Sequence, residues 1–109
     1  MWFMFPQVAG LGSSSTAQRY AIRSRAEAKA YLDHPILGPS LRECTAIVLA
    51  IKHKTAFQIF GTPDDLKFCS SMTLFDAIAP GDVFAQALAR YCAGECDERT
   101  LKIMAAWPD

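Results

Sequence analysis

Residues 59–75 read IFGTPDDLKFCSSMTLF, and this stretch decides how the rest of the chain can fold. Gly61 can adopt the positive φ angle that closes a preceding helix. Thr62 then offers an N-cap oxygen, and Pro63 fits the first helical position, where its missing N–H costs nothing. The two aspartates that follow complement the positive end of a helix dipole. We therefore expect one helix to end at Gly61 and another to begin directly after it.

The second of these helices carries apolar residues around nearly its whole circumference, so we expect it to run through the core rather than lie on it. These residues are Leu66, Phe68, Cys69, Met72, Leu74, Phe75 and Ile78. Of these, Leu66, Cys69, Met72 and Phe75 are predicted to be buried.

The flanking segments also carry helix signals, and no stretch alternates with the period of two that marks a strand. We expect helices over residues 25–33 after the cap Ser24, from Ser40 to 54, over 55–60, after the cap Asp82 as far as Gly94, and after the cap Asp97 as far as Trp107. Four of these helices have an expected buried face. In the first it is Ala26, Ala30 and Tyr31, and in the second Leu41, Cys44, Ile47, Val48 and Ile51. In the helix after Asp82 it is Val83, Phe84, Ala87, Leu88 and Tyr91, and in the helix after Asp97 it is Leu101, Met104 and Ala105. The predicted fold is all-α: one compact multihelical bundle with short connections, spanning residues 1–109.

Composition narrows the function classes. The chain has 109 residues, 51% of them hydrophobic, and its 11 basic and 11 acidic residues balance to a net charge of zero. An ordered single domain is expected, and intrinsic disorder is not. Neutrality argues against nucleic acid as a partner, because the basic run from Arg19 to Lys29 is too short to follow a phosphate backbone. No apolar run suits a bilayer span, so no membrane partner is expected.

The four cysteines form no C-x-x-C pair, and neither histidine lies at a metal-ligand spacing from them. Cys44 and Cys69 fall within apolar helical runs, where a free thiol behaves as a small hydrophobic residue. Cys92 and Cys96 flank Gly94 at a helix end, and we expect neither zinc nor a disulfide there. This cysteine usage predicts a cytoplasmic protein with free thiols, no metal and no cofactor.

The chain opens with the apolar residues Trp2, Phe3 and Phe5, which folded domains rarely leave uncovered at an end. They predict a surface that docks a partner or a second copy. The loop from Gly10 to Ser15 then leads into a helix start, and such a loop can hold an anion through backbone N–H groups. It lacks the spacing and the lysine of a P-loop, so an ordinary connector is favoured over an anion site.

Several blocks of the sequence, taken together and in order, resemble the signature of a bacterial family, domain of unknown function 1810. The blocks are Trp2-Phe3-Met4-Phe5-Pro6-Gln7, Gly10-Leu11-Gly12, Tyr20-Ala21-Ile22, His34-Pro35-Ile36-Leu37-Gly38-Pro39 and Lys67-x-x-Ser70-Ser71-Met72-Thr73-Leu74-Phe75. The resemblance implies an all-helical single domain of unassigned activity. Some members carry a calpastatin label, but the inhibitory repeats of calpastatin are disordered, whereas this chain has the composition of an apolar globule.

Two features depart from that family pattern. Members usually have a further helix upstream of the Trp-Phe block, so either the natural chain begins upstream of Met1 or this is a shortened member that lacks the helix; the shortened member is the expectation. Ser40 stands where members often carry a basic residue after Gly-Pro, so a binding role for this position is not carried over.

The central helix also takes polar residues into the predicted core, where each needs a hydrogen-bond partner. Lys67 lies one turn from both Ser70 and Ser71, so its ammonium and their hydroxyls could meet on one face. A buried lysine can serve as base to a serine nucleophile, but no oxyanion hole is recognisable and the catalytic residues stay unknown. The alternative is that Lys67 extends to solvent while Ser70, Ser71 and Thr73 bond to carbonyls one turn back.

The residues leave three function classes open. The favoured hypothesis is a small-molecule binding module for an anionic ligand. Its candidate residues are Lys67, Ser70, Ser71, Thr73, Arg19, Tyr20, Gln7 and His34, although for His34 a capping or hydrogen-bonding role is favoured. The first alternative is a protein–protein interaction or self-association domain that uses Trp2, Phe3 and Phe5. The second is a small hydrolase-like enzyme that uses Lys67, Ser70 and Ser71.

Overall fold

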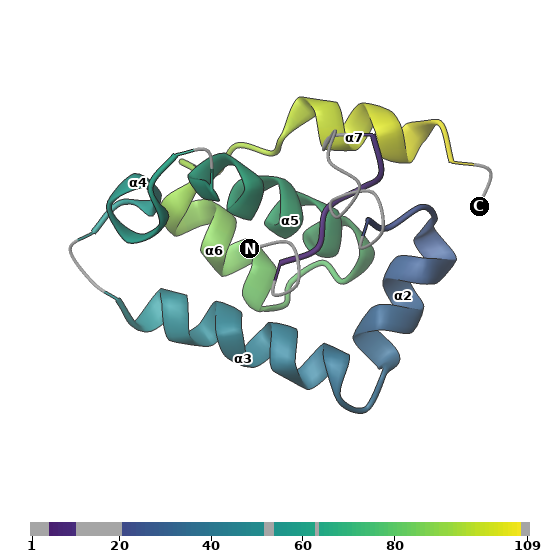
Figure 1. The fold of residues 1–109 in the computed structure, drawn as a ribbon, viewed down its shortest axis with the longest axis horizontal. Helices are drawn as coiled ribbons and strands as arrows, with labels where there is room; N and C mark the ends of the chain where they lie inside the picture. The colour runs from purple at the N-terminus through teal and green to yellow at the C-terminus, as the bar shows by residue number, and fades with distance from the viewer. Residues whose placement is uncertain (1–4, 11–20, 52–53, 63, 108–109) are drawn as a thin grey trace.

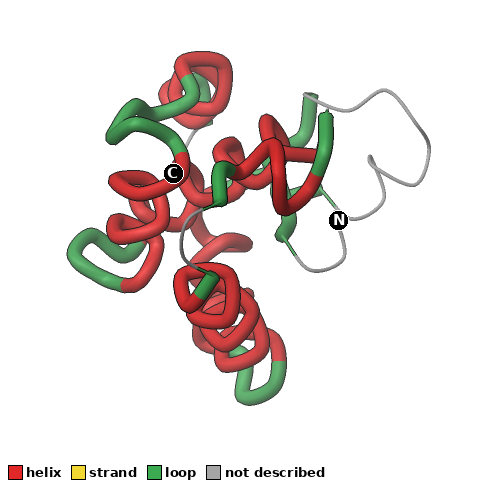
Figure 2. Tube along the Cα trace, turned by 90° about the vertical axis from the view of Figure 1, so that its left-hand side faces the viewer, coloured by secondary structure: helices red, strands yellow, loops and turns green. Residues whose placement is uncertain are grey.

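The computed structural model describes residues 5–10, 21–51, 54–62 and 64–107. Within them the chain forms six helices and no strand (Figures 1 and 2). The helices are α2 (Arg25–Asp33), α3 (Leu37–Ala50), α4 (Ala56–Phe60), α5 (Asp64–Ile78), α6 (Val83–Tyr91) and α7 (Glu98–Ala105). The predicted all-α class is confirmed.

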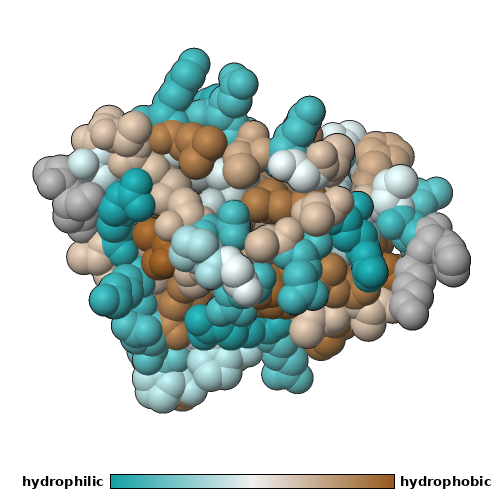
Figure 3. All heavy atoms as spheres, turned by 180° about the vertical axis from the view of Figure 1, so that it is seen from behind, coloured by the Kyte–Doolittle hydropathy of each residue, from teal (hydrophilic) through white to brown (hydrophobic). Residues whose placement is uncertain are grey.

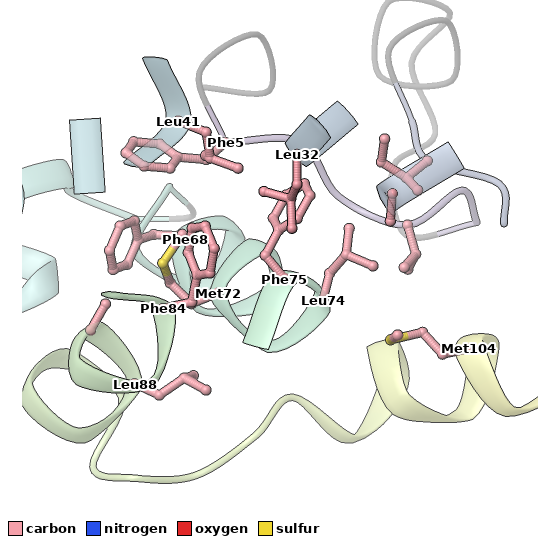
Figure 4. Close-up of a cluster of buried hydrophobic side chains, with 14 of the residues drawn as sticks. Phe5, Leu32, Leu41, Phe68, Met72, Leu74, Phe75, Phe84, Leu88 and Met104 are labelled. Atoms are coloured by element: carbon pink, nitrogen blue, oxygen red, sulfur yellow. The ribbon is translucent and has the colours of Figure 1, made fainter. Parts of the chain in front are cut away.

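Helix α5 is the centre of the fold. It contacts α2, α4, α6 and α7, while α3 packs on α2 and α6. In Figure 1, α7 lies above α5 and α3 runs along the opposite side of the molecule. Residue 68 and every residue from 70 to 75 are buried, as expected of a helix with neighbours on several sides. Met72 and Phe75 are fully buried, which confirms the prediction for both (Figure 4).

Aromatic rings fill one end of this core. Phe68 stacks on Phe60 with ring centroids 4.9 Å apart, and Phe5 meets Phe68 edge-on with centroids 5.0 Å apart. Phe5 is only 1% exposed, so the expectation that it forms part of a docking surface is wrong. Its ring is covered by this chain's own α4 and α5. Trp2 and Phe3 lie outside the described residues.

The start of the chain is held against the core by backbone hydrogen bonds. The Ile22 N–H donates to the Gln7 carbonyl, and the Ala9 N–H donates to the Ile22 carbonyl, both at 2.8 Å. Val8 and Ile22 form an isolated parallel bridge and are themselves buried. This pairing fixes where the N-terminal segment crosses the bundle, so Phe5 can reach Phe68.

The predicted caps Ser24, Asp82 and Asp97 are confirmed. Ser24 accepts from the Glu27 N–H, Asp82 from the Val83 N–H and Asp97 from the Thr100 N–H. Gly61 has φ 73° and ends α4, as its position before the next helix predicts. Pro63 lies outside the described residues.

His34 explains why α3 begins at residue 37 and not at Ser40. Its Nδ1 accepts from the backbone N–H groups of Ile36 and Leu37, both at 3.1 Å, which satisfies donors at the start of the helix. The corner is tight, because a Cβ atom on Gly38 would lie 1.9 Å from the Leu32 carbonyl oxygen. The hydrogen-bonded capping role predicted for His34 is confirmed.

Several predicted buried faces are only partly right, because the helix faces a different neighbour: Leu41, Val48 and Met104 are buried as predicted, and other members of these faces are not. In α3 the residues toward the bundle are Leu41, Thr45 and Val48, and Ile47 is 58% exposed. Thr45 occupies a core position because its hydroxyl donates to the Leu41 carbonyl at 2.9 Å. Ile51, also predicted to be buried, is only partly buried.

Similar shifts occur in three other helices. Leu66 is 64% exposed, because α5 enters the core only after its first turn. In α2, Ala28 and Leu32 are buried in place of Ala26 and Ala30. In α7, Thr100 and Met104 are buried, whereas Leu101 and Ala105 are exposed.

The cysteine prediction is also wrong for one pair. Cys69 in α5 and Cys92, the C-cap residue of α6, form a disulfide, with their Cα atoms 6.0 Å apart. The two residues are 23 positions apart, and only the packing of α5 on α6 brings them together. Cys44 and Cys96 are free thiols.

No described helix has both the length and the apolar character needed to cross a membrane. Among the residues the structure describes, no group of three or more histidine, cysteine or acidic side chains is placed to hold a metal ion.

We expect Met72→Ala to lower the free energy of unfolding by roughly 2–5 kcal/mol, because Met72 is fully buried and its truncation leaves a cavity. Leu66→Ala is the matched control, and its cost should stay within about 0.5 kcal/mol since most of the side chain is in water. Urea denaturation of the two variants measures both values. Equal costs would contradict the position of α5 described here.

Candidate functional site

The polar residues of α5 do not form the predicted Lys67–serine site. The Lys67 ammonium pairs with Asp64, one turn earlier in the same helix, at 3.8 Å between Nζ and Oδ1. Both side chains are about two-fifths exposed, at 39% and 42%. Such a surface pair contributes little to stability. Lys67 therefore extends to solvent, which was the alternative interpretation of this residue.

Ser70 and Thr73 instead fasten α7 to α5 through Asp97. Asp97 Oδ2 lies 3.1 Å from the Ser70 hydroxyl, 3.1 Å from the Thr100 N–H and 2.5 Å from the Thr100 hydroxyl. The Asp97 backbone N–H donates in turn to Thr73 Oγ1 at 2.9 Å. The hydroxyls also face carbonyls one turn back, Ser70 that of Leu66 and Thr73 that of Cys69, as predicted.

Ser71 is the exception among the core hydroxyls of this helix. It is fully buried, and its hydroxyl has no hydrogen-bond partner among the described residues. A nucleophilic serine needs a neighbouring base, and the nearest candidate by sequence, Lys67, pairs with Asp64. The geometry therefore does not support the hydrolase hypothesis at this position.

The other predicted site residues lie apart from α5's polar face or outside the described chain. His34 is at the α2–α3 corner, whereas Lys67 is near the start of α5, at the α4 end of the molecule (Figure 1). Gln7 is half-buried, and its backbone carbonyl accepts from Ile22. Arg19, Tyr20 and residues 11–15 of the glycine-rich loop lie outside the described residues, and Gly10 is exposed.

A second feature, which the predicted buried faces did not include, is the face formed by α3 and α6. At one end the Arg42 Nε donates to Asp82 Oδ2 at 3.1 Å. At the other end the Tyr91 hydroxyl faces the carbonyls of Val48 and of Ile51, the latter at 2.7 Å. The first half of α3 therefore contacts the start of α6, and the ends of the two helices also meet, so α3 and α6 run parallel.

Arg90 completes the contact between the two helix ends. Its guanidinium donates from Nη1 to the carbonyl of Leu49, in the last turn of α3. Carbonyls of a last helical turn have no intrahelical partner, so Arg90 and Tyr91 act as a C-terminal cap supplied by another helix. This cap holds Arg90 at the surface, directly beside Ala50.

Between the two helices lies an open groove of about 670 Å³. Its walls are Ala46, Leu49, Ala50, Gln86, Ala89 and Arg90. Both helices line it with positions i, i+3 and i+4, which share one helical face. We call this groove, together with the exposed Glu43 and Ile47 of α3, the α3–α6 face. The small residues at positions 46, 50 and 89 could have indicated this groove from the sequence. The prediction that Ile47 is buried obscured that signal.

Asp82 supplies the negative charge of the ion pair between α3 and the start of α6. The hydrogen bond from the Val83 N–H, 2.6 Å from Oδ1, lowers the pKa of the Asp82 carboxyl, and the Arg42 guanidinium lowers it further. Partial burial opposes both effects but is outweighed. The ionised carboxylate is therefore stabilised in the folded state, where it also caps α6.

Residues 1–104 match the protein family described as protein of unknown function DUF1810. The chain belongs to the DUF1810 family. The structure is similar to the crystal structure of the conserved hypothetical protein Rv1873 from Mycobacterium tuberculosis, with a TM-score of 0.93 and 50% sequence identity. The match covers 96% of this chain and 76% of the mycobacterial one, so the latter is the longer chain. The comparison with curated proteins found no match.

We expect Asp97→Ala to lower the free energy of unfolding by about 1–3 kcal/mol, because it removes the α7 cap and one acceptor shared by Ser70 and Thr100. Lys67→Met is the control, with an expected change within about 0.5 kcal/mol because its ion pair is exposed. Urea denaturation measures both. A larger effect of Lys67→Met than of Asp97→Ala would contradict the site described here.

The lowered pKa of Asp82 predicts a pH-dependent contribution to stability. A depressed folded-state pKa gives stability that is present above the unfolded pKa of about 4 and is lost as pH falls through the folded pKa. At pH 7 we expect Asp82→Asn to cost about 0.5–1 kcal/mol, because the amide can still cap α6 but lacks the charge that pairs with Arg42 and complements the helix dipole. The difference from wild type should shrink below about pH 4. Urea denaturation across this range would show a constant difference if the carboxylate had no role.

Proposed function

We propose that this DUF1810 protein is a self-associating interaction domain, in which the α3–α6 face of one copy packs on the same face of a second copy. The observation that carries the proposal is Ile47, which is 58% exposed on a helix whose other surface is in the core. Ala46 and Ala50 flank it and are exposed as well. On the side of the molecule opposite to Figure 1, hydrophobic residues reach the surface between hydrophilic ones (Figure 3).

The spacing on α3 is self-complementary. Glu43, Ala46, Ile47 and Ala50 stand at i, i+3, i+4 and i+7, so they share one face of the helix. If two copies of α3 cross antiparallel with the two-fold axis between residues 46 and 47, residue 43 of each copy lies opposite residue 50 of the other. Alanine at 46 and 50 lets the two helices approach closely, and each Ile47 packs beside the axis. A two-fold pairing of this kind buries the same patch on both copies.

Charge supports the same arrangement. In the antiparallel pairing, Glu43 of one copy lies over Ala50 of the other, next to Leu49. Arg90 donates to the Leu49 carbonyl from Nη1 and has further N–H groups for a carboxylate. Each copy therefore places an acid where its partner places a base, and the two-fold axis makes both contacts at once. A parallel pairing would instead bring the two Glu43 carboxylates together.

The anionic-ligand hypothesis stays a prediction, and the geometry supports it less well. Lys67 is paired with Asp64, and Ser70 and Thr73 bond to Asp97 or its backbone. A ligand at this position would have to displace contacts that hold α7 in place. Cytoplasmic location also stays a prediction, since the Cys69–Cys92 disulfide removes the free-thiol argument for two of the four cysteines.

Sedimentation velocity tests the proposal. At about 100 μM, well above a micromolar Kd, we expect a dimer for the wild type. Glu43→Arg and Arg90→Glu should each weaken the dimer about tenfold or more, because each puts two like charges together. The double variant with both changes should restore the dimer, because residues 43 and 90 of facing copies again carry opposite charges. Lys102→Glu, on α7, is the control. It changes the net charge by as much as Arg90→Glu and should leave the dimer unchanged.

Two results would overturn the proposal. One is a wild-type monomer at this concentration, and the other is a dimer that resists both reversals. Thermal denaturation of each variant shows that it is folded. Glu43→Arg is the cleaner single variant, because Arg90 also caps α3 and Glu43 is an exposed residue without an ion pair in the described chain.

A further inference from the structure

Three of the four cysteines lie around the end of α6. Cys92 is the C-cap residue of this helix and is joined to Cys69 in α5. Cys96 follows four residues later and carries an exposed free thiol. A disulfide and a free thiol this close in the chain form the minimal unit for thiol–disulfide exchange.

The backbone between Cys92 and Cys96 doubles back at once. Ala93 and Gly94 have φ angles of 56° and 72°, both in the left-handed region that ends helices. The Gly94 N–H donates to the Leu88 carbonyl, and the Glu95 N–H donates to the Cys92 carbonyl, both at 2.9 Å. The second bond closes a tight turn that starts on Cys92. Cys96 is therefore the first residue after a turn that brings the chain back toward Cys92.

We propose that Cys96 is the nucleophile of a thiol–disulfide exchange site formed with Cys92 and Cys69. The Cys96 thiolate attacks Cys92 Sγ, the Cys92–Cys96 bond forms and the Cys69–Cys92 bond breaks. The electron pair of the broken bond leaves on Cys69, which takes up the proton that Cys96 released. One disulfide and one thiol are present before and after the step, so it needs no external oxidant or reductant.

The surroundings of the leaving cysteine, Cys69, and of the attacking cysteine, Cys96, suit this exchange. Cys69 Sγ lies 4.0 Å from the Tyr91 carbonyl oxygen, which can accept from the S–H that forms on the leaving cysteine. Residues 93–96 are all exposed, so this segment can adjust to the new bond. Glu95 and Asp97 flank Cys96 and would repel an anionic small-molecule disulfide. Attack on Cys92 within the same chain avoids that repulsion and the cost of a second molecule.

The exchange moves the disulfide from between two helices to an exposed loop. There it is accessible to a reducing dithiol, the chemical class that we expect to regenerate the thiols. It also removes the covalent tie between α5 and the end of α6 that carries Arg90 and Tyr91, the residues that cap α3. The further consequence, a weaker dimer after reduction, rests on the proposed function, whereas the exchange itself does not.

Peptide mapping tests the exchange directly. Trypsin cleavage after Lys67, Arg90 and Arg99 puts Cys69 in peptide 68–90 and both Cys92 and Cys96 in peptide 91–99. Protein purified without reductant is held at about pH 8.5, where thiols exchange readily, for the minutes to hours that uncatalysed rearrangement takes. Free thiols are then blocked with N-ethylmaleimide before digestion and mass spectrometry.

In the starting form, peptides 68–90 and 91–99 are cross-linked and Cys96 carries the blocking group. We expect peptide 91–99 with an internal disulfide to accumulate with time, together with peptide 68–90 blocked at Cys69. Cys96→Ser should keep only the cross-linked pair, and Cys44→Ser, the matched control, should behave as the wild type.

An unchanged cross-linked pair with blocked Cys96 would overturn the proposal. So would a Cys69–Cys96 link with blocked Cys92, because the attacked sulfur would then be that of Cys69. Sedimentation with and without dithiothreitol is a separate measurement. A wild-type monomer under both conditions, with exchange still seen by mapping, would remove the self-association proposal and leave the exchange site standing.

Discussion

The burial of α5 is the constraint on which the rest of the structure depends. A helix in contact with four others has few positions at which a polar side chain can reach water. Ser70 and Thr73 satisfy this constraint through carbonyls of their own helix and through Asp97, so the same contacts that make them tolerable in the core also fix α7. The Ser70 and Thr73 hydroxyls are thus explained by assembly of the fold, whereas the Ser71 hydroxyl has no partner among the described residues.

The end of α6 is a second centre of organisation. Within three successive residues, Arg90 and Tyr91 cap α3 and Cys92 is bonded to α5. The stability of this short segment therefore controls how α3 is aligned with α6. Among the described residues, the opposite side of α3 is left without a neighbour, which is why Ile47 and its flanking alanines are at the surface.

These two centres support different kinds of function. Among the described residues, the buried polar side-chain atoms of α5 have hydrogen-bond partners apart from the Ser71 hydroxyl and Asp65 Oδ1, and Lys67 pairs with Asp64 rather than with a serine. The end of α6, in contrast, combines an exposed cation, an open groove and a disulfide with a free thiol nearby. The proposed interaction surface and the proposed exchange site therefore both rest on the end of α6 and not on α5.

The sequence by itself determined the helical class, the central place of α5, and the helix ends at Ser24, Gly61, Asp82 and Asp97. These features depend on residues within one turn of each other, or on the apolar circumference of one helix. Only the tertiary structure decided that Leu66 and Ile47 are exposed, that Phe5 is buried, and that Cys69 pairs with Cys92. Each of these outcomes depends on which face of an element meets a neighbour distant in the chain, and periodicity within one helix carries no information about that neighbour.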